Sequence, residues 1–160
     1  MEELATRVHE LLIERGETVS TAESLTGGRL AAELTHAPGA SRSYLGGVVA
    51  YATSVKQRVL GVPDAVVERH GVISGECALA MARGAAAVTD ATWGVSTTGV
   101  AGPDEQEGHP PGTVYVGVVG PGVSTALALE LVGDRTAIQD RTCAEALSAL
   151  AGMLSSPGGG

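Results

Sequence analysis

Apolar and polar residues alternate along the chain with two periods, one typical of helices and the other typical of strands. Leu4, Val8, Leu11 and Leu12 recur every three or four positions, which predicts a helix over residues 2–15. The same spacing, bounded by glycine, proline or a capping residue, predicts further helices at residues 29–35, around residue 56, at 63–69, 74–88 and 134–154. Short β-branched stretches predict strands at residues 18–21, 44–51, 93–97, 114–119 and 123–131.

The order of these elements predicts the fold class. Helices and strands alternate in the first half of the chain, and two neighbouring strands come late. This order is typical of an α/β protein, and we expect a single three-layer α/β/α domain with a mixed, mainly parallel central sheet. The domain should span residues 1–154, and residues 155–160 should form a disordered tail because they have no means of packing. Ligands bind such sheets where strands end, so we expect the active site at the loops after residues 22, 51 and 97.

The charge balance limits the partners that the protein can bind. Its net charge is −8 at pH 7 and its basic residues form no cluster, which argues against a nucleic-acid partner. An anionic ligand would have to be held by local donors, because the overall field repels it. No signal peptide or membrane span is visible, so we expect a cytoplasmic protein that does not bind membranes.

Cysteine and histidine positions indicate neither a disulfide nor a metal centre. Cys77 and Cys143 lie far apart on predicted helix faces, and they fit buried reduced thiols better than a disulfide. The four histidines show no paired ligand spacing, so we expect no metal site.

Lys56 is the only lysine in the chain, beside nine arginines. A buried ammonium can lose its proton and act as a base for a serine nucleophile, whereas a guanidinium stays charged. Lys56 follows Tyr51 where a predicted strand enters a helix, a position at which the helix dipole disfavours a cation. Two interpretations remain open at this point: a functional amine, or an ordinary exposed lysine left by coding bias.

Further segments carry small hydroxyl residues beside glycines at predicted turns. Backbone N–H groups at such turns can hold an anion or an oxyanion, and the hydroxyl groups add donors. Arg135, at the start of the last predicted helix, could add a guanidinium for a phosphate. Each segment also has a purely structural interpretation, as a helix cap, a turn or a surface loop. The candidate residues in these turns are Ser24, Thr26, Gly27, Ser41, Thr98 and Gly99.

Seven motifs follow one another along almost the whole chain: AESLTGG, PGAS, YATSVK, GVIS, STTGVAGP, PPGTVYVG and GDR. Together they resemble the CinA C-terminal domain family, from about residue 4 to residue 152. Stand-alone members of that family include deamidases of nicotinamide mononucleotide (NMN), which release ammonia and nicotinic acid mononucleotide. The resemblance therefore implies an amidohydrolase that acts on a linear amide in pyridine nucleotide recycling, with NMN as its small-molecule substrate and without a cofactor.

The resemblance also implies which residues act. The family nucleophile maps to Ser41 of the PGAS motif, and its base maps to Lys56, assisted by Tyr51. Lys56, neutral in a closed pocket, would take the proton from Ser41, which then attacks the carboxamide carbon. The residues expected to bind substrate are Ser24, Thr26, Gly27, Thr98, Gly99 and Arg135.

One loop departs from the family pattern. After Gly102 and Pro103 the family usually has a glycine pair and later a Lys-Pro-Val-Gly run, whereas residues 104–111 read DEQEGHPP here. Acidic and amide residues replace the glycines, and His109 replaces the lysine. This difference leaves the substrate open, so an amidase for a related amide is one alternative to an NMN deamidase.

Two other classes of function remain alternatives. One is a non-catalytic nucleotide-binding module, and the other is an interaction protein associated with competence or DNA damage. In either case the apolar strands and small helix faces are compatible with a homo-oligomer, most simply a dimer.

Overall fold

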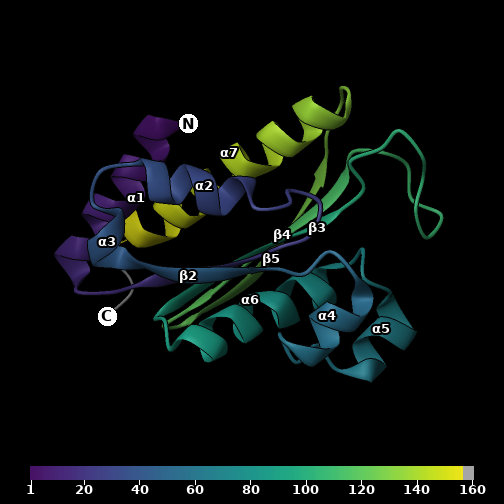
Figure 1. Ribbon diagram of the computed structural model, residues 1–160, viewed down its shortest axis with the longest axis horizontal. Coiled ribbons are helices and arrows are strands. Elements are labelled where there is room, and N and C mark those ends of the chain that lie inside the picture. The colour runs from purple at the N-terminus through teal and green to yellow at the C-terminus, as the bar shows by residue number, and fades with distance from the viewer. Residues whose placement is uncertain (157–160) are drawn as a thin grey trace.

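A five-stranded sheet forms the centre of the protein in the computed structural model, which describes residues 1–156 (Figure 1). β1 pairs in parallel with both β2 and β3, and β4 runs antiparallel to β3 and β5. Four of the five strands therefore point in one direction. The strands follow the order β2 (Tyr44–Val49), β1 (Val19–Glu23), β3 (Trp93–Gly99), β4 (Thr113–Gly120) and β5 (Val123–Glu130).

Helices cover both faces of this sheet, which confirms the predicted three-layer α/β/α architecture with a mixed sheet (Figure 1). One layer contains α1 (Glu2–Arg15), α2 (Arg29–His36), α3 (Ala40–Ser43) and α7 (Arg135–Ser155). The opposite layer contains α4 (Thr53–Arg58), α5 (Asp64–His70) and α6 (Gly75–Thr89).

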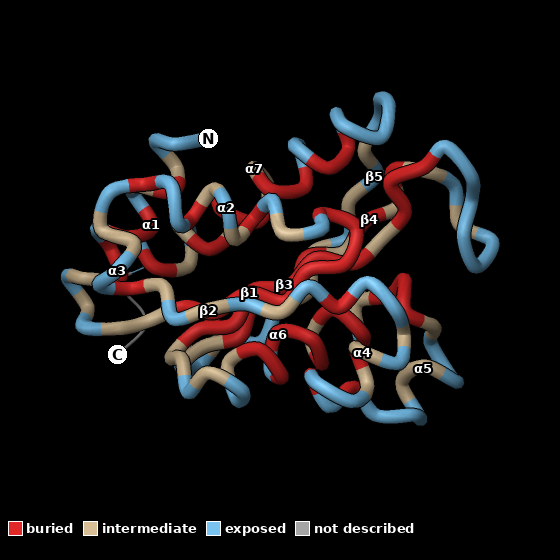
Figure 2. Tube along the Cα trace, viewed as in Figure 1, coloured by how far each residue is buried: buried red, intermediate tan, exposed pale blue. Residues whose placement is uncertain are grey.

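Two apolar clusters hold the layers together, one on each face of the sheet. The larger cluster joins α1, α2 and α7 to the sheet, and the smaller one joins α6 and the chain around α4. All five residues of β1 are buried, because this strand lies inside the sheet and is covered from both sides (Figure 2). Burial of this apolar surface is the main favourable term that fixes the strand ends relative to one another.

The parallel strands determine where a site can form. β2, β1 and β3 are neighbours that point in one direction, so their carboxyl ends lie at the same edge of the sheet. The loops that follow Glu23, Val49 and Gly99 therefore meet at this edge. It is the edge at which the sequence predicts a ligand site.

The helix boundaries agree with the capping signals in the sequence, with two exceptions. Ser74 and Asp134 cap α6 and α7 with their side chains, as predicted. The first exception is α3, a short helix where a turn was expected. The second is Ser155, expected in the tail but part of α7; residues 157–160 lie outside the described residues.

Cys77 and Cys143 are buried free thiols, as predicted. Within residues 1–156, no helix combines the length and the apolar character needed to cross a bilayer.

Two helical glycines provide a test of this packing. A Cβ at Gly84 in α6 would lie 2.0 Å from the carbonyl oxygen of Leu60, whereas a Cβ at Gly152 in α7 would meet no atom within 4 Å. We expect Gly84→Ala to destabilise the protein by roughly 2 kcal/mol or more, because α6 must move away from the backbone. Gly152→Ala should stabilise it by up to about 1 kcal/mol through helix propensity. Urea unfolding of both variants measures this contrast, and equal effects would contradict the close approach at Gly84.

Candidate active site

Lys56 lies inside the protein at the edge where the parallel strands end. Its side chain is only 1% exposed. The amine nitrogen Nζ lies 3.0 Å from the hydroxyl oxygen of Ser24, 2.8 Å from the carbonyl oxygen of Ala50 and 3.0 Å from that of Tyr51. Ser24 directly follows β1, and the two carbonyls follow β2. The parallel pairing of β1 and β2 therefore brings these groups together.

The three contacts can be made in either protonation state, since an ammonium can donate to all three oxygens. A neutral amine can donate its two hydrogens to the two carbonyl oxygens, and its lone pair can accept the hydrogen of the Ser24 hydroxyl. Burial lowers the pKa of Lys56 from its ordinary value of 10.5, because desolvation penalises the charged form, while interactions with Cys77 and Glu107 oppose this shift. A hydroxyl beside a base of lowered pKa is the arrangement that activates a serine nucleophile.

Glu23 fixes the turn on which Ser24 lies. Its buried carboxylate accepts hydrogen bonds from the N–H groups of Leu30 at 2.8 Å and Ala31 at 3.0 Å, in the first turn of α2. The Thr26 hydroxyl donates to the same carboxylate at 2.6 Å. Free N–H groups and the helix dipole both stabilise a negative charge at this position. These bonds join β1, the Ser24 turn and α2 into one unit.

A cavity of about 350 Å³ opens in front of Ser24, while Lys56 lies behind it. This volume falls within the range of roughly 300–1,000 Å³ that small-molecule sites occupy. Arg135 spans the cavity, because it donates to the carbonyl oxygen of Gly102 at 2.6 Å and to the hydroxyl of Tyr51 at 3.3 Å. The lining consists of Ser24, Leu25, Tyr51, Arg135 and residues 99–106.

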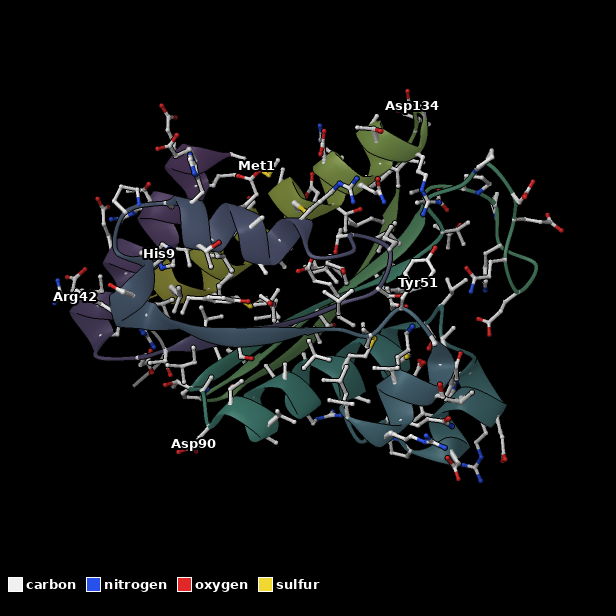
Figure 3. The ribbon with its side chains drawn as sticks, in the orientation of Figure 1. Met1, His9, Arg42, Tyr51, Asp90 and Asp134 are labelled. Carbon is white, nitrogen blue, oxygen red and sulfur yellow. The ribbon has the colours of Figure 1, made fainter. Side chains whose placement is uncertain are left out.

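The structure does not bring Ser41 to Lys56. Ser41 is exposed in α3, before β2, whereas Lys56 follows β2. The six residues of β2 alone extend about 20 Å. Arg42, the neighbour of Ser41, and Tyr51 lie far apart in Figure 3, on the sides of the molecule where β2 begins and ends. Within one chain the structure therefore does not bring Ser41 to Lys56, and Ser24 is the serine beside the amine.

Tyr51 holds the amine through its backbone rather than its phenol. Its side chain is 63% exposed at the cavity, where the hydroxyl accepts the bond from Arg135, while its carbonyl oxygen accepts from Lys56. The phenol is therefore placed to meet a ligand, and the carbonyl positions the amine of Lys56.

The residues expected to bind substrate divide into two groups. Thr26 and Thr98 turn their hydroxyls inward: Thr26 bonds to Glu23, and Thr98 donates to the carbonyl oxygen of Val72 at 2.6 Å. Gly27 lies at the turn into α2 and does not belong to the lining. The expected residues that do line the cavity are Ser24, Gly99 and Arg135.

Three neighbours of the site were not singled out from the sequence: Glu23, Cys77 and Glu107. The only available signal for Glu23 is its place between a strand and a glycine-containing turn into a helix, where a carboxylate can bind free N–H groups. Burial raises the pKa of Cys77 to about 11, so this thiol stays protonated at neutral pH. Among residues 1–156, no cluster of three or more His, Cys, Asp or Glu side chains could hold a metal ion.

Known proteins share both the sequence and the fold of this chain. The family model of the CinA C-terminal domain matches residues 1–154. A CinA-like protein of Frankia casuarinae is 44% identical over 144 residues, and one of Anaeromyxobacter is 46% identical over 150 residues. These matches cover 90% and 93% of this chain but 33% and 37% of the relatives, so the chain spans about a third of their length.

Solved structures match over the whole domain. A competence damage-inducible protein of Klebsiella pneumoniae superposes with a TM-score of 0.94 at 32% identity, covering 98% of both chains. A competence/damage inducible protein of Agrobacterium tumefaciens gives a TM-score of 0.91 at 34% identity, covering 97% of this chain and 95% of the other.

The lowered pKa of Lys56 predicts a pH-dependent stability. The unfolded chain titrates near 10.5, so it binds more protons than the folded protein between the lowered pKa and that value. The free energy of unfolding should therefore gain a contribution from Lys56 as the pH rises through this window. Lys56→Met removes this contribution, so the wild type should gain stability relative to the variant as the pH rises towards 10.5. Urea unfolding of both proteins measures the difference, and parallel pH profiles would contradict a lowered pKa.

Proposed function

Since the chain belongs to the CinA C-terminal domain family, we propose that it is an amidohydrolase that converts NMN and water into nicotinic acid mononucleotide and ammonia. In this proposal Ser24 is the nucleophile and Lys56 is its base. The observation that carries the proposal is the 3.0 Å contact between the Ser24 hydroxyl and the buried amine, at the wall of a cavity.

The reaction proceeds in two halves. Neutral Lys56 takes the proton of the Ser24 hydroxyl as the oxygen attacks the carboxamide carbon of NMN, which forms a tetrahedral intermediate. Lys56 then returns the proton to the leaving nitrogen, ammonia departs, and an ester joins the substrate to Ser24. In the second half Lys56 takes a proton from water as it attacks the ester, and then returns this proton to the oxygen of Ser24 as nicotinic acid mononucleotide leaves.

The developing oxyanion needs donors that are already in place. Leu25 lines the cavity directly after Ser24, so its backbone N–H is the donor that we assign to the oxyanion. Loss of one such donor typically raises the barrier by about 3 kcal/mol.

The lining offers contacts for the other parts of NMN. The guanidinium of Arg135 can bind the phosphate, and the exposed ring of Tyr51 can stack on the pyridinium cation. The fixed charge of the pyridinium also disfavours protonation of the nearby amine, which keeps Lys56 ready to act as a base.

Replacing each member of the pair tests the assignment. Ser24→Ala removes the nucleophile, and Lys56→Arg keeps a cation that cannot serve as a base. We expect each change to reduce ammonia release from NMN roughly 1,000-fold or more, because the two groups act as a unit. Ser41→Ala is the matched control, and it should retain wild-type turnover because Ser41 is exposed before β2.

Two results would contradict this assignment. Near-normal turnover in Lys56→Arg would exclude the amine as the base. Loss of turnover in Ser41→Ala, with retention in Ser24→Ala, would move the nucleophile to α3. If the wild type binds NMN without releasing ammonia, a nucleotide-binding module explains the cavity better than an amidase.

Substitution of Arg135 tests the proposed contact with the phosphate of NMN. We expect Arg135→Gln to raise KM for NMN roughly tenfold to a hundredfold, because a charged hydrogen bond contributes about 1.5–3 kcal/mol. Nicotinamide riboside lacks the phosphate, so its kcat/KM should change little. Arg141→Gln is the matched control, since Arg141 lies on the same helix and pairs with Glu145 on the surface. An unchanged KM for NMN in Arg135→Gln would place the phosphate elsewhere.

A related cationic amide is a second candidate substrate. Asp104 and Glu105 bring two carboxylates into the lining, where Arg135 is the only basic residue. These carboxylates favour a cationic amide and oppose a phosphate. A higher kcat/KM for nicotinamide riboside than for NMN would favour this candidate.

A further inference from the structure

Glu107 makes contacts that are unusual for an acidic residue in a surface loop. One carboxylate oxygen, Oε1, accepts hydrogen bonds from the N–H groups of Val72 and Ile73, both at 3.1 Å. The other oxygen, Oε2, lies 3.3 Å from the N–H of Val72. The backbone of Glu107 has a φ of 52°, in the left-handed region that is unfavourable for a residue with a side chain. The contacts with two successive N–H groups offset this cost.

The segment that Glu107 binds is itself part of the framework of the site. It precedes α6, and its Val72 carbonyl oxygen accepts the hydrogen bond from Thr98 at the end of β3. α6 begins three residues further on, and it carries Cys77, whose thiol interacts with Lys56. The backbone N–H of Val72 is therefore held by Glu107, and its carbonyl oxygen is held by Thr98 of β3.

The loop that Glu107 belongs to forms one wall of the cavity. Residues 99–106 belong to the lining, and Gln106 and His109 pair with each other across Glu107 through two backbone hydrogen bonds of 3.1 and 2.9 Å. This pairing makes a tight turn with Glu107 near its tip, so a contact at Glu107 restrains the lining residues that come directly before it.

We propose that Glu107 is a positioning residue, which fastens the turn at residues 106–109 to the segment before α6 and thereby holds the cavity wall beside Ser24. This role rests on the proposed amidase function of the same cavity. A carboxylate is suited to it, because charged hydrogen bonds to backbone N–H groups are about twice as strong as neutral ones. The segment also leaves room for the carboxylate, since a Cβ at Gly71 would lie 2.8 Å from Oε1.

The charge of Glu107 gives the proposal a readout that a purely structural contact would not affect. Burial lowers the pKa of Lys56, and the two groups that oppose this shift are Cys77 on α6 and Glu107 on the loop. Burial keeps Cys77 protonated at neutral pH, which leaves the carboxylate of Glu107 as the group to test. Removal of this charge should lower the pKa of Lys56 further. The acid limb of kcat/KM should then move to lower pH, because the neutral amine persists there.

Two variants separate the contact from the charge. Glu107→Gln keeps an oxygen that can accept from the backbone but removes the charge, whereas Glu107→Ala removes both. We expect the acid limb for NMN hydrolysis to move to lower pH in both variants. KM should rise roughly tenfold in Glu107→Ala and less in Glu107→Gln, with kcat changing less than KM. Glu68→Gln, an exposed carboxylate on α5, is the matched control for the loss of one charge.

Hydrogen exchange of the backbone amides tests the contact between Glu107 and the Val72–Ile73 segment, and it does not depend on catalysis. The amides of Val72 and Ile73 should exchange roughly tenfold faster in Glu107→Ala than in the wild type, and at wild-type rates in Glu68→Gln. Unchanged exchange would overturn the proposed contact even if the protein does not hydrolyse NMN. Faster exchange together with an unchanged KM and pH profile would overturn the positioning role and leave a purely structural contact. If Glu107→Ala does not fold, the pH profile of kcat/KM for Glu107→Gln tests the proposal instead. An acid limb at the wild-type pH in this variant would contradict the positioning role.

Discussion

The site depends on the burial of one amine against one hydroxyl. Lys56 is enclosed by two backbone carbonyls and Ser24, and a cationic side chain in that position would lose its hydration without gaining a carboxylate partner. The unfavourable desolvation is relieved when the amine is neutral. In the chemistry that we propose, this amine is the base and the neighbouring hydroxyl is the nucleophile. The stability of the fold and the chemistry that we propose are therefore linked through the protonation state of one residue.

The surrounding structure holds the Ser24 hydroxyl and the Lys56 amine next to each other. Parallel pairing of β1 with β2 brings Ser24 to the carbonyls that hold the amine, although 32 residues separate Ser24 from Lys56 in the chain. Glu23 fixes the turn from one side by binding the start of α2. On the other side, Thr98 and Glu107 hold the segment that leads into α6. The cavity is thus formed by loops whose ends are anchored in the sheet.

The sequence predicts the elements and singles out Lys56, but it does not identify the serine that lies beside it. Helix periodicity and the caps Ser74 and Asp134 act locally, so they identify α6 and α7 without knowledge of the rest of the fold. Lys56 stands out by its composition alone. Ser41 and Ser24 are both serines beside turns, and only the direction of β2 decides which of them faces the amine. Inward-turned hydroxyls, such as that of Thr98, and the contacts of a loop carboxylate likewise depend on tertiary neighbours that no local pattern encodes.

The presence of a single lysine allows its protonation to be measured directly. Protein labelled with carbon-13 at the lysine Cε position gives one side-chain resonance, from Lys56, whose chemical shift reports the charge of the amine. Titration of this resonance should give a pKa below the ordinary 10.5, because the amine is buried beside Ser24. A titration at or above 10.5 would contradict the account, since a protonated Lys56 could not take the proton of Ser24.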